Sequence, residues 1–163
     1  MATSPLTLVM ALDVDASQLP ALQKVVATAQ AEINAALTSV GTVHFARVLV
    51  LDTSSPNLQF TATPAGPFAL AVITEYDGDF ARYTQDFVNK IGDVFDMLLK
   101  FTVGGSALVP VTDNVAAFTA FVAANDLSQQ PPNDGGNRLY SAYPQTVQQI
   151  LAKFPPAAAP VPA

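Results

Sequence analysis

Three polar side chains inside two apolar segments could support acid–base chemistry or anion binding. His44 and Arg47 lie in VHFARVLVL (residues 43–51), and Glu75 lies in FALAVITEY (residues 68–76). A carboxylate inside an apolar strand is unfavourable unless it is paired, and histidine titrates near neutral pH. We therefore take His44, Arg47 and Glu75 as candidate catalytic residues, with Arg47 anchoring an anionic or carbonyl group and Glu75 holding it in place or acting as a base.

Each of these residues also has a structural interpretation. Arg47 and Glu75 could form an ion pair at a subunit interface, and His44 could bond a backbone carbonyl or Tyr76. The chain has one histidine and no cysteine, so the sequence predicts no metal site and no resident cofactor. Haem ligation by His44 is a further alternative, which the visible absorption spectrum of the protein and of a His44→Ala variant would test.

The apolar patterns predict the elements that position these side chains. Strands are expected at residues 6–14, 43–51 and 68–76, and helices at residues 17–40 and about 79–101, where apolar residues recur at three- and four-residue steps. Pro20 suits the first turn of the first helix, and Gly41 suits its C-cap. Asp77-Gly78 reads as a turn, and Asp79 as the N-cap of the second helix.

The remaining chain is expected to hold one more strand and two more helices. RLYSAYP, at residues 138–144, is the expected fourth strand. Residues 102–137 form an insertion before it, with one short helix capped by Asp113 or Asn114. After Pro144, the sequence TVQQILAKF carries apolar residues on one helical face and predicts a C-terminal helix.

This order, β-α-β-β-α-β, is the ferredoxin-like arrangement of the α+β class. It predicts an antiparallel four-stranded sheet in the order 4-1-3-2, with the helices on one face. The sequence predicts a single domain over residues 1–154 and a Pro/Ala-rich extended tail over residues 155–163. One sheet face is left open, and we expect it to carry the site.

Alternation along the neighbouring strands at residues 43–51 and 68–76 separates two sets of side chains. The more uniformly apolar set is assigned to the helices: His44, Ala46, Val48, Val50, Phe68, Leu70, Val72, Thr74 and Tyr76. The open face is assigned Val43, Phe45, Arg47, Leu49, Ala69, Ala71, Ile73 and Glu75. The assignment assumes that neither strand contains a bulge, because one extra residue would exchange the faces.

The open face is expected to bind a small apolar ligand or a second subunit. The candidate ligand-binding residues are Phe45, Ile73, Tyr76, Asp77, Tyr140 and Tyr143. Half of the chain is hydrophobic and only 12% is charged. Because so little charge leaves apolar surface to cover, we expect a homodimer.

Composition argues against two classes of partner. The net charge is −6 and no window holds a Lys/Arg cluster, so nucleic-acid binding is not expected. No segment approaches the ~20 apolar residues that span a bilayer, so no membrane association is expected. The N-terminus reads as a strand and not as a signal peptide, which predicts a cytoplasmic protein.

Three segments carry a resemblance to a known group. VHFARVLVLD (43–52), AVITEYDGDFARYTQDF (71–87) and LYSAYPQTVQQI (139–150) resemble uncharacterised bacterial proteins with a similar His-Phe-Ala-Arg strand and Tyr-Asp-Gly turn. That group is similar to the ferredoxin-like dimeric α+β barrel superfamily, which includes dye-decolourising peroxidases, chlorite dismutases and antibiotic-biosynthesis monooxygenases. The resemblance implies this fold and a role for His44, Arg47, Tyr76 and Asp77. It carries over no haem ligand, because His44 does not match the peroxidases' proximal motif.

These observations predict a small-molecule binding protein or cofactor-independent enzyme, with an apolar pocket between the open sheet face and the insertion. The alternative is a non-catalytic homodimeric interaction module, for example an accessory of a redox system. The second alternative is the haem protein described above.

Overall fold

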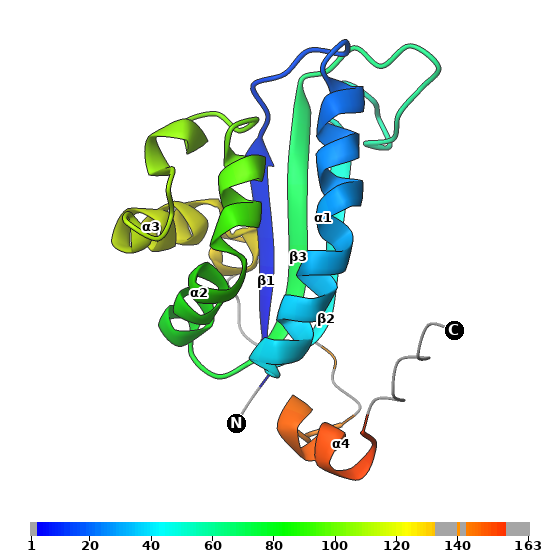
Figure 1. The fold of residues 1–163 in the computed structure, drawn as a ribbon. Helices are drawn as coiled ribbons and strands as arrows, with labels where there is room; N and C mark the ends of the chain where they lie inside the picture. The colour runs from blue at the N-terminus through cyan, green and yellow to red at the C-terminus, as the bar shows by residue number, and fades with distance from the viewer. Residues whose placement is uncertain (1–2, 133–139, 141–142, 156–163) are drawn as a thin grey trace, which may run out of the picture.

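The computed structural model describes residues 3–132, 140 and 143–155, which form an α+β fold (Figure 1). The strands are β1 (Thr3–Ala11), β2 (Val43–Asp52) and β3 (Phe68–Asp77), in one antiparallel sheet ordered β1-β3-β2. The helices are α1 (Leu19–Val40), α2 (Phe80–Leu99), α3 (Val115–Asn125) and α4 (Val147–Lys153), with 3-10 turns η1 (Gly105–Leu108) and η2 (Leu127–Gln129). No helix of the described part is long and apolar enough to cross a membrane.

The α+β class and the antiparallel sheet are confirmed, but the described sheet has three strands where four were expected. Residues 138, 139, 141 and 142 of the expected fourth strand lie outside the described residues, as do residues 156–163 of the tail. Tyr140, Tyr143 and Pro144 are described and are not in a strand. The short helix expected in the insertion is α3, and the expected C-terminal helix is α4.

Local sequence accounts for the ends of the two long helices. α1 has Pro20 in its first turn and ends at Gly41, which has a φ of 64° and donates its N–H to the Leu37 carbonyl. α2 starts after Asp79, whose carboxylate accepts from the Arg82 N–H at 2.9 Å. Both predicted caps are therefore confirmed. The Asp79 cap sets where α2 starts after β3.

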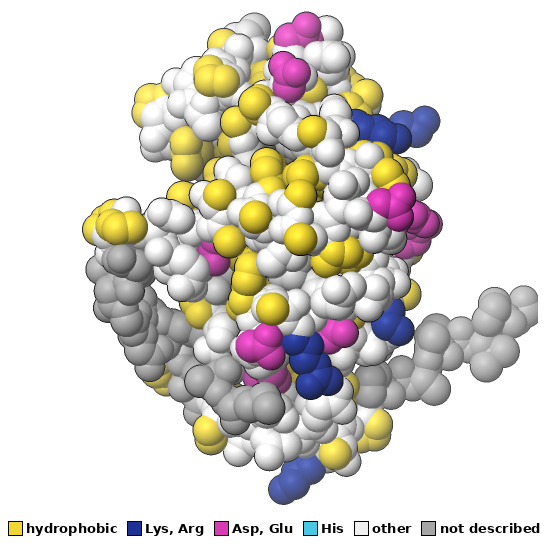
Figure 2. All heavy atoms as spheres, turned by 90° about the vertical axis from the view of Figure 1, so that its left-hand side faces the viewer, with side chains coloured by type: hydrophobic (Ala, Val, Ile, Leu, Met, Phe, Trp, Pro, Cys, Tyr) yellow, Lys and Arg dark blue, Asp and Glu magenta, His cyan; other side chains and the backbone are white. Residues whose placement is uncertain are grey.

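The core lies between the sheet and the two long helices, which cover one sheet face in Figure 1. Even-numbered residues of β1 and β3 fill the sheet side of it, and the aromatic rings of α2 and α3 fill the other. The buried side chains include Leu6, Leu8, Met10, Leu70, Val72, Leu22, Ile33, Tyr83, Phe87, Phe95, Phe118 and Val122. Figure 2 shows the α2 and α3 side of the molecule, where apolar side chains are spread among few charged ones.

The insertion covers the outer edge of β1. The Asp126 carboxylate accepts from the Thr7 N–H at 2.9 Å, and the Val103 N–H donates to the Ala11 carbonyl at 2.9 Å. Asp126 and Leu8 also form an isolated antiparallel β-bridge. The fourth strand was expected on this edge. Among the described residues, the insertion instead provides hydrogen-bond partners for backbone groups of β1 there.

Candidate functional site

The register of the sheet places Arg47 and Glu75 on the same open face. Phe45 lies opposite Glu75, and Arg47 lies opposite Ile73 on the neighbouring strand. Pro5 of β1 flanks Glu75 on its other side. The face assignment of these residues from the sequence is therefore confirmed. The side chain of Phe45 is 74% exposed there.

Glu75 is poorly solvated and incompletely bonded. Its Oε2 atom is buried and has no hydrogen-bond partner among the described residues. Burial raises the pKa of Glu75, and the nearby charge of His44 opposes the shift in part. The apolar neighbours Pro5 and Phe45 explain the desolvation. Glu75 therefore keeps its proton to a higher pH than an ordinary glutamate, and in that form it can donate a hydrogen bond.

A bulge at the start of β2 changes the predicted faces of Val43 and His44. The register shifts between Val43 and Phe45, so Val43 pairs with Tyr76 and packs against the core. The placement of Val43 on the open face was wrong, because the extra residue reverses the alternation. His44 leaves the alternation, and its Nε2 atom lies 3.0 Å from the Oδ1 atom of Asp77. Its hydrogen-bond partner is therefore Asp77 and not Tyr76.

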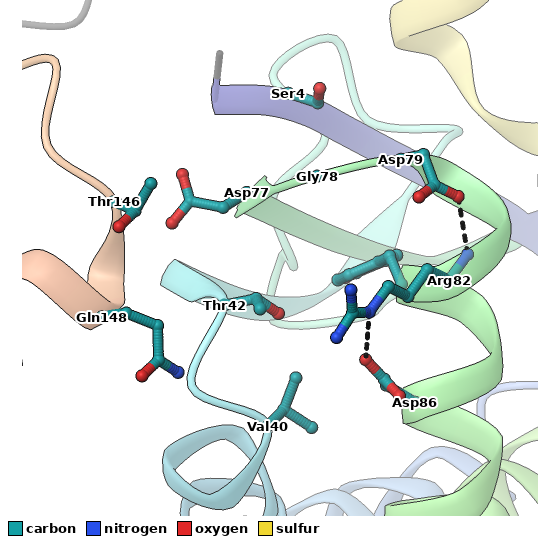
Figure 3. A pocket seen from close by; sticks show the side chains of 11 residues that line it. Ser4, Val40, Thr42, Asp77, Gly78, Asp79, Arg82, Asp86, Thr146 and Gln148 are labelled. Carbon is teal, nitrogen blue, oxygen red and sulfur yellow. Dashed lines mark hydrogen bonds and ion pairs between the residues drawn. The ribbon is translucent and has the colours of Figure 1, made fainter. Parts of the chain in front are cut away.

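Asp77 joins three segments at the end of the sheet. One carboxylate oxygen bonds His44, and the other accepts from the Val147 N–H at 2.7 Å, at the start of α4. Its backbone N–H donates to the Thr42 carbonyl at 2.8 Å. Figure 3 shows the carboxylate directed toward Thr146 and away from Arg82. The sequence indicated a turn at Asp77 but contained no signal for its contact with residue 147, which is distant in the chain.

A cleft of about 800 Å³ lies beside Asp77, at the end of the sheet and the start of α2. Its polar lining includes Ser4, Thr42, Asp77, Asp79, Arg82, Asp86, Thr146 and Gln148. In Figure 3 the Arg82 side chain extends toward Asp86, and the Nε–Oδ2 distance is 3.9 Å. Asp77 is the only sequence-predicted site residue among those lining this cleft.

The predicted tyrosine ligands occupy different surroundings. Tyr76 is 4% exposed and stacks on Tyr83, with ring centroids 3.9 Å apart. It therefore belongs to the core on the helix side. Tyr140 and Tyr143 are 88% and 73% exposed, and most of the strand predicted around them lies outside the described residues.

The arrangement at the end of the open face has acid–base potential. A histidine held by a carboxylate, as His44 is by Asp77, has the geometry of a base and its orienting group. Glu75 is close enough for the charge of His44 to affect its pKa. Among the described residues, no group of three His, Cys, Asp or Glu side chains is placed to hold a metal ion.

Comparison of the chain with protein-family models, with curated proteins and with solved structures finds no match.

Proposed function

We propose that this protein binds a small, largely apolar molecule on the open sheet face, through a carbonyl or carboxylate group of that molecule. Arg47 is the anchor, and Glu75 with His44 is the hydrogen-bonding or acid–base group. One observation carries the proposal: Glu75 has a buried, unbonded oxygen, while Arg47 on the same face is exposed and has no ion pair among the described residues.

Within the described residues the two charges do not pair with each other, which supports a bound ligand as their partner. An internal ion pair would satisfy Glu75 and hold Arg47 against it, and the described residues contain no such pair. A protonated Glu75 can donate to a carbonyl oxygen, and a guanidinium binds carboxylates well. Phe45 and Ile73 supply the apolar surface beside them.

A ferredoxin-like architecture is part of the proposal. The order β1-β3-β2 is the order of strands 1, 3 and 2 in that fold, and both long helices lie on one face. A small-molecule site on the open face agrees with the resemblance. A cofactor-independent enzyme would use the same residues, with His44 or Glu75 moving a proton.

The test compares wild type with Arg47→Met, Glu75→Gln and the double variant. Thermal stability and binding of a panel of apolar carboxylates and carbonyl compounds, followed by ligand-observed NMR, are measured for all four proteins. We expect both single variants and the double variant to lose binding while remaining folded. Arg82→Met, which removes an arginine outside the open face, should bind like wild type. Unchanged binding in the double variant would contradict the proposal.

A second candidate is a homodimeric interaction module that pairs through the open face. The exposed ring of Phe45 favours it, because large apolar side chains seldom stay in water without a partner. Ile73→Lys would place a charge at the centre of this face and should dissociate such a dimer. Sedimentation of wild type and Ile73→Lys over micromolar concentrations measures this, and identical behaviour of the two would reject face pairing.

A further inference from the structure

The two edges of the sheet differ in how their backbone groups are satisfied. On β1, residues of the insertion contact the outer edge at Pro5, Thr7 and Ala11. On β2, the described residues make one such contact, at the end of the strand, where the Asp52 N–H donates to the Leu58 carbonyl at 3.3 Å. The middle of the β2 edge is therefore uncovered by the described residues.

The direction of the end contacts identifies the free backbone groups. Successive residues of a strand direct their backbone groups alternately to the two sides. The Thr53 N–H donates toward β3, to the Pro67 carbonyl at 2.9 Å, whereas the Asp52 N–H donates to the loop. The register has no irregularity between residues 45 and 52. The N–H and C=O groups that point away from β3 are therefore those of Ala46, Val48 and Val50.

This edge lacks the features that keep strands from pairing. Natural edge strands are usually short, or carry prolines, bulges or several charges. β2 has 10 residues, no proline, a bulge only at its start beside His44, and one arginine, Arg47, before its terminal Asp52. Phe45 and Ala46 are exposed beside the free edge.

We propose that the outer edge of β2 pairs with β2 of a second copy of the chain, antiparallel and centred on Val48. In this register Val48 lies opposite the partner's Val48, and Ala46 lies opposite the partner's Val50. Each hydrogen-bonded pair exchanges two N–H···O bonds, so the three pairs would form about six. All three free residues find equivalent groups on the partner, and neither the bulge nor the occupied Asp52 N–H takes part.

Side chains support a second copy as the occupant. The same register places Phe45 opposite the partner's Leu51, and Arg47 opposite the partner's Leu49. Each pair is therefore apolar or sets the aliphatic stem of an arginine against leucine. The result is a continuous sheet across both copies, with both open faces on the same side. Pairing at the edge leaves the proposed ligand face accessible, so the two proposals stand or fall independently.

The test uses charges placed at the two-fold axis of the full chain. Val48→Lys and Val48→Glu each set like charges directly opposite one another, which is unfavourable. We expect wild type to sediment as a dimer, each variant alone as a monomer, and an equimolar mixture of the two variants as a dimer. A wild-type monomer across micromolar concentrations would overturn the proposal, as would variants that remain dimeric or a mixture that stays monomeric.

A second variant covers the case in which Val48, which packs partly against the core, does not tolerate a charge. Ala46→Pro removes an outward N–H at an exposed position and should also give a folded monomer by circular dichroism and sedimentation. Ala46→Ser keeps the N–H and should remain dimeric. A dimer lost in Ile73→Lys but kept in Ala46→Pro would assign pairing to the open face. Slow hydrogen exchange at Ala46, Val48 and Val50 in a monomeric protein would show that an extended peptide segment, not a second copy, pairs with the β2 edge. Either result would overturn the proposal.

Discussion

Glu75 illustrates how one residue's surroundings set its chemistry. It lies on the open face of the sheet, yet Pro5 and Phe45 flank it and one of its oxygens is buried. Desolvation penalises the charged form, so its pKa is raised. A carboxyl group in this state can take part in proton transfer at a higher pH than an ordinary glutamate.

The raised pKa of Glu75 predicts a pH-dependent stability difference. A carboxyl whose pKa is higher in the folded state binds more protons there, so stability falls as pH rises from its ordinary pKa through its folded pKa. Glu75→Gln removes this loss. The melting temperature of Glu75→Gln minus that of wild type should therefore be larger at about pH 7 than at about pH 4. Thermal unfolding by circular dichroism measures this. Glu32→Gln, at an exposed position of α1, should show no such change, and equal shifts in both variants would contradict the assignment.

At the scale of elements, short polar contacts decide where helices and strands end. Asp79 begins α2, and Asp126 covers part of the β1 edge. Asp77 connects the end of β3 to α4. These aspartates direct the chain between elements, which explains why so many of the acidic residues lie at junctions.

The cap at Asp79 should have a measurable effect on stability. Asp79→Ala removes the acceptor for the Arg82 N–H and should lower the free energy of unfolding by ~0.5–2 kcal/mol. Asp79→Asn keeps an acceptor oxygen and should retain most of the stability. Urea denaturation of the three proteins compares them. A normal stability for Asp79→Ala, together with lost ligand binding, would mean that Asp79 acts as a site residue.

The contact between Asp126 and β1 should cost more to remove. Asp126 is buried and accepts from the Thr7 N–H and from Ser128. Asp126→Ala leaves these donors without their acceptor, which should lower the free energy of unfolding by about 1–3 kcal/mol. Asp113→Ala, an exposed change in the same insertion, should have little effect. Equal urea midpoints for Asp126→Ala and wild type would show that the edge is not held by this residue.

At the scale of the whole molecule, the core and the C-terminal helix α4 contribute unequally to stability. The sheet, α1, α2 and α3 share one buried cluster, which includes Phe118 of α3. α4 has no buried residue. It is attached through the Asp77–Val147 hydrogen bond and a bond from the Gln148 amide to the Gly41 carbonyl.

This inequality predicts the result of a truncation. A chain that ends at Pro144 loses α4 and should lose only about 1–3 kcal/mol of unfolding free energy, the net worth of its hydrogen bonds. Phe118→Ala empties a core site and should cost ~3–5 kcal/mol. Urea unfolding of both variants gives the comparison. A truncation that costs as much as Phe118→Ala would show that α4 belongs to the core.

The sequence by itself determined the elements whose signals are local. The apolar periods located β1, β2, β3 and the two long helices, and the turn residues located the caps at Gly41 and Asp79. Even the faces of Arg47 and Glu75 followed from alternation, because side-chain direction in a regular strand depends only on position.

Only the tertiary structure decided the features that depend on distant residues. The bulge that moved Val43 and His44 depends on pairing with β3, and the His44–Asp77–Val147 connection joins residues far apart in the chain. The cover that the insertion gives the β1 edge, and that the described residues do not give the middle of the β2 edge, likewise depends on packing between elements. Residue spacing encodes periodicity along one element, whereas these contacts arise from packing between elements, which no local pattern records.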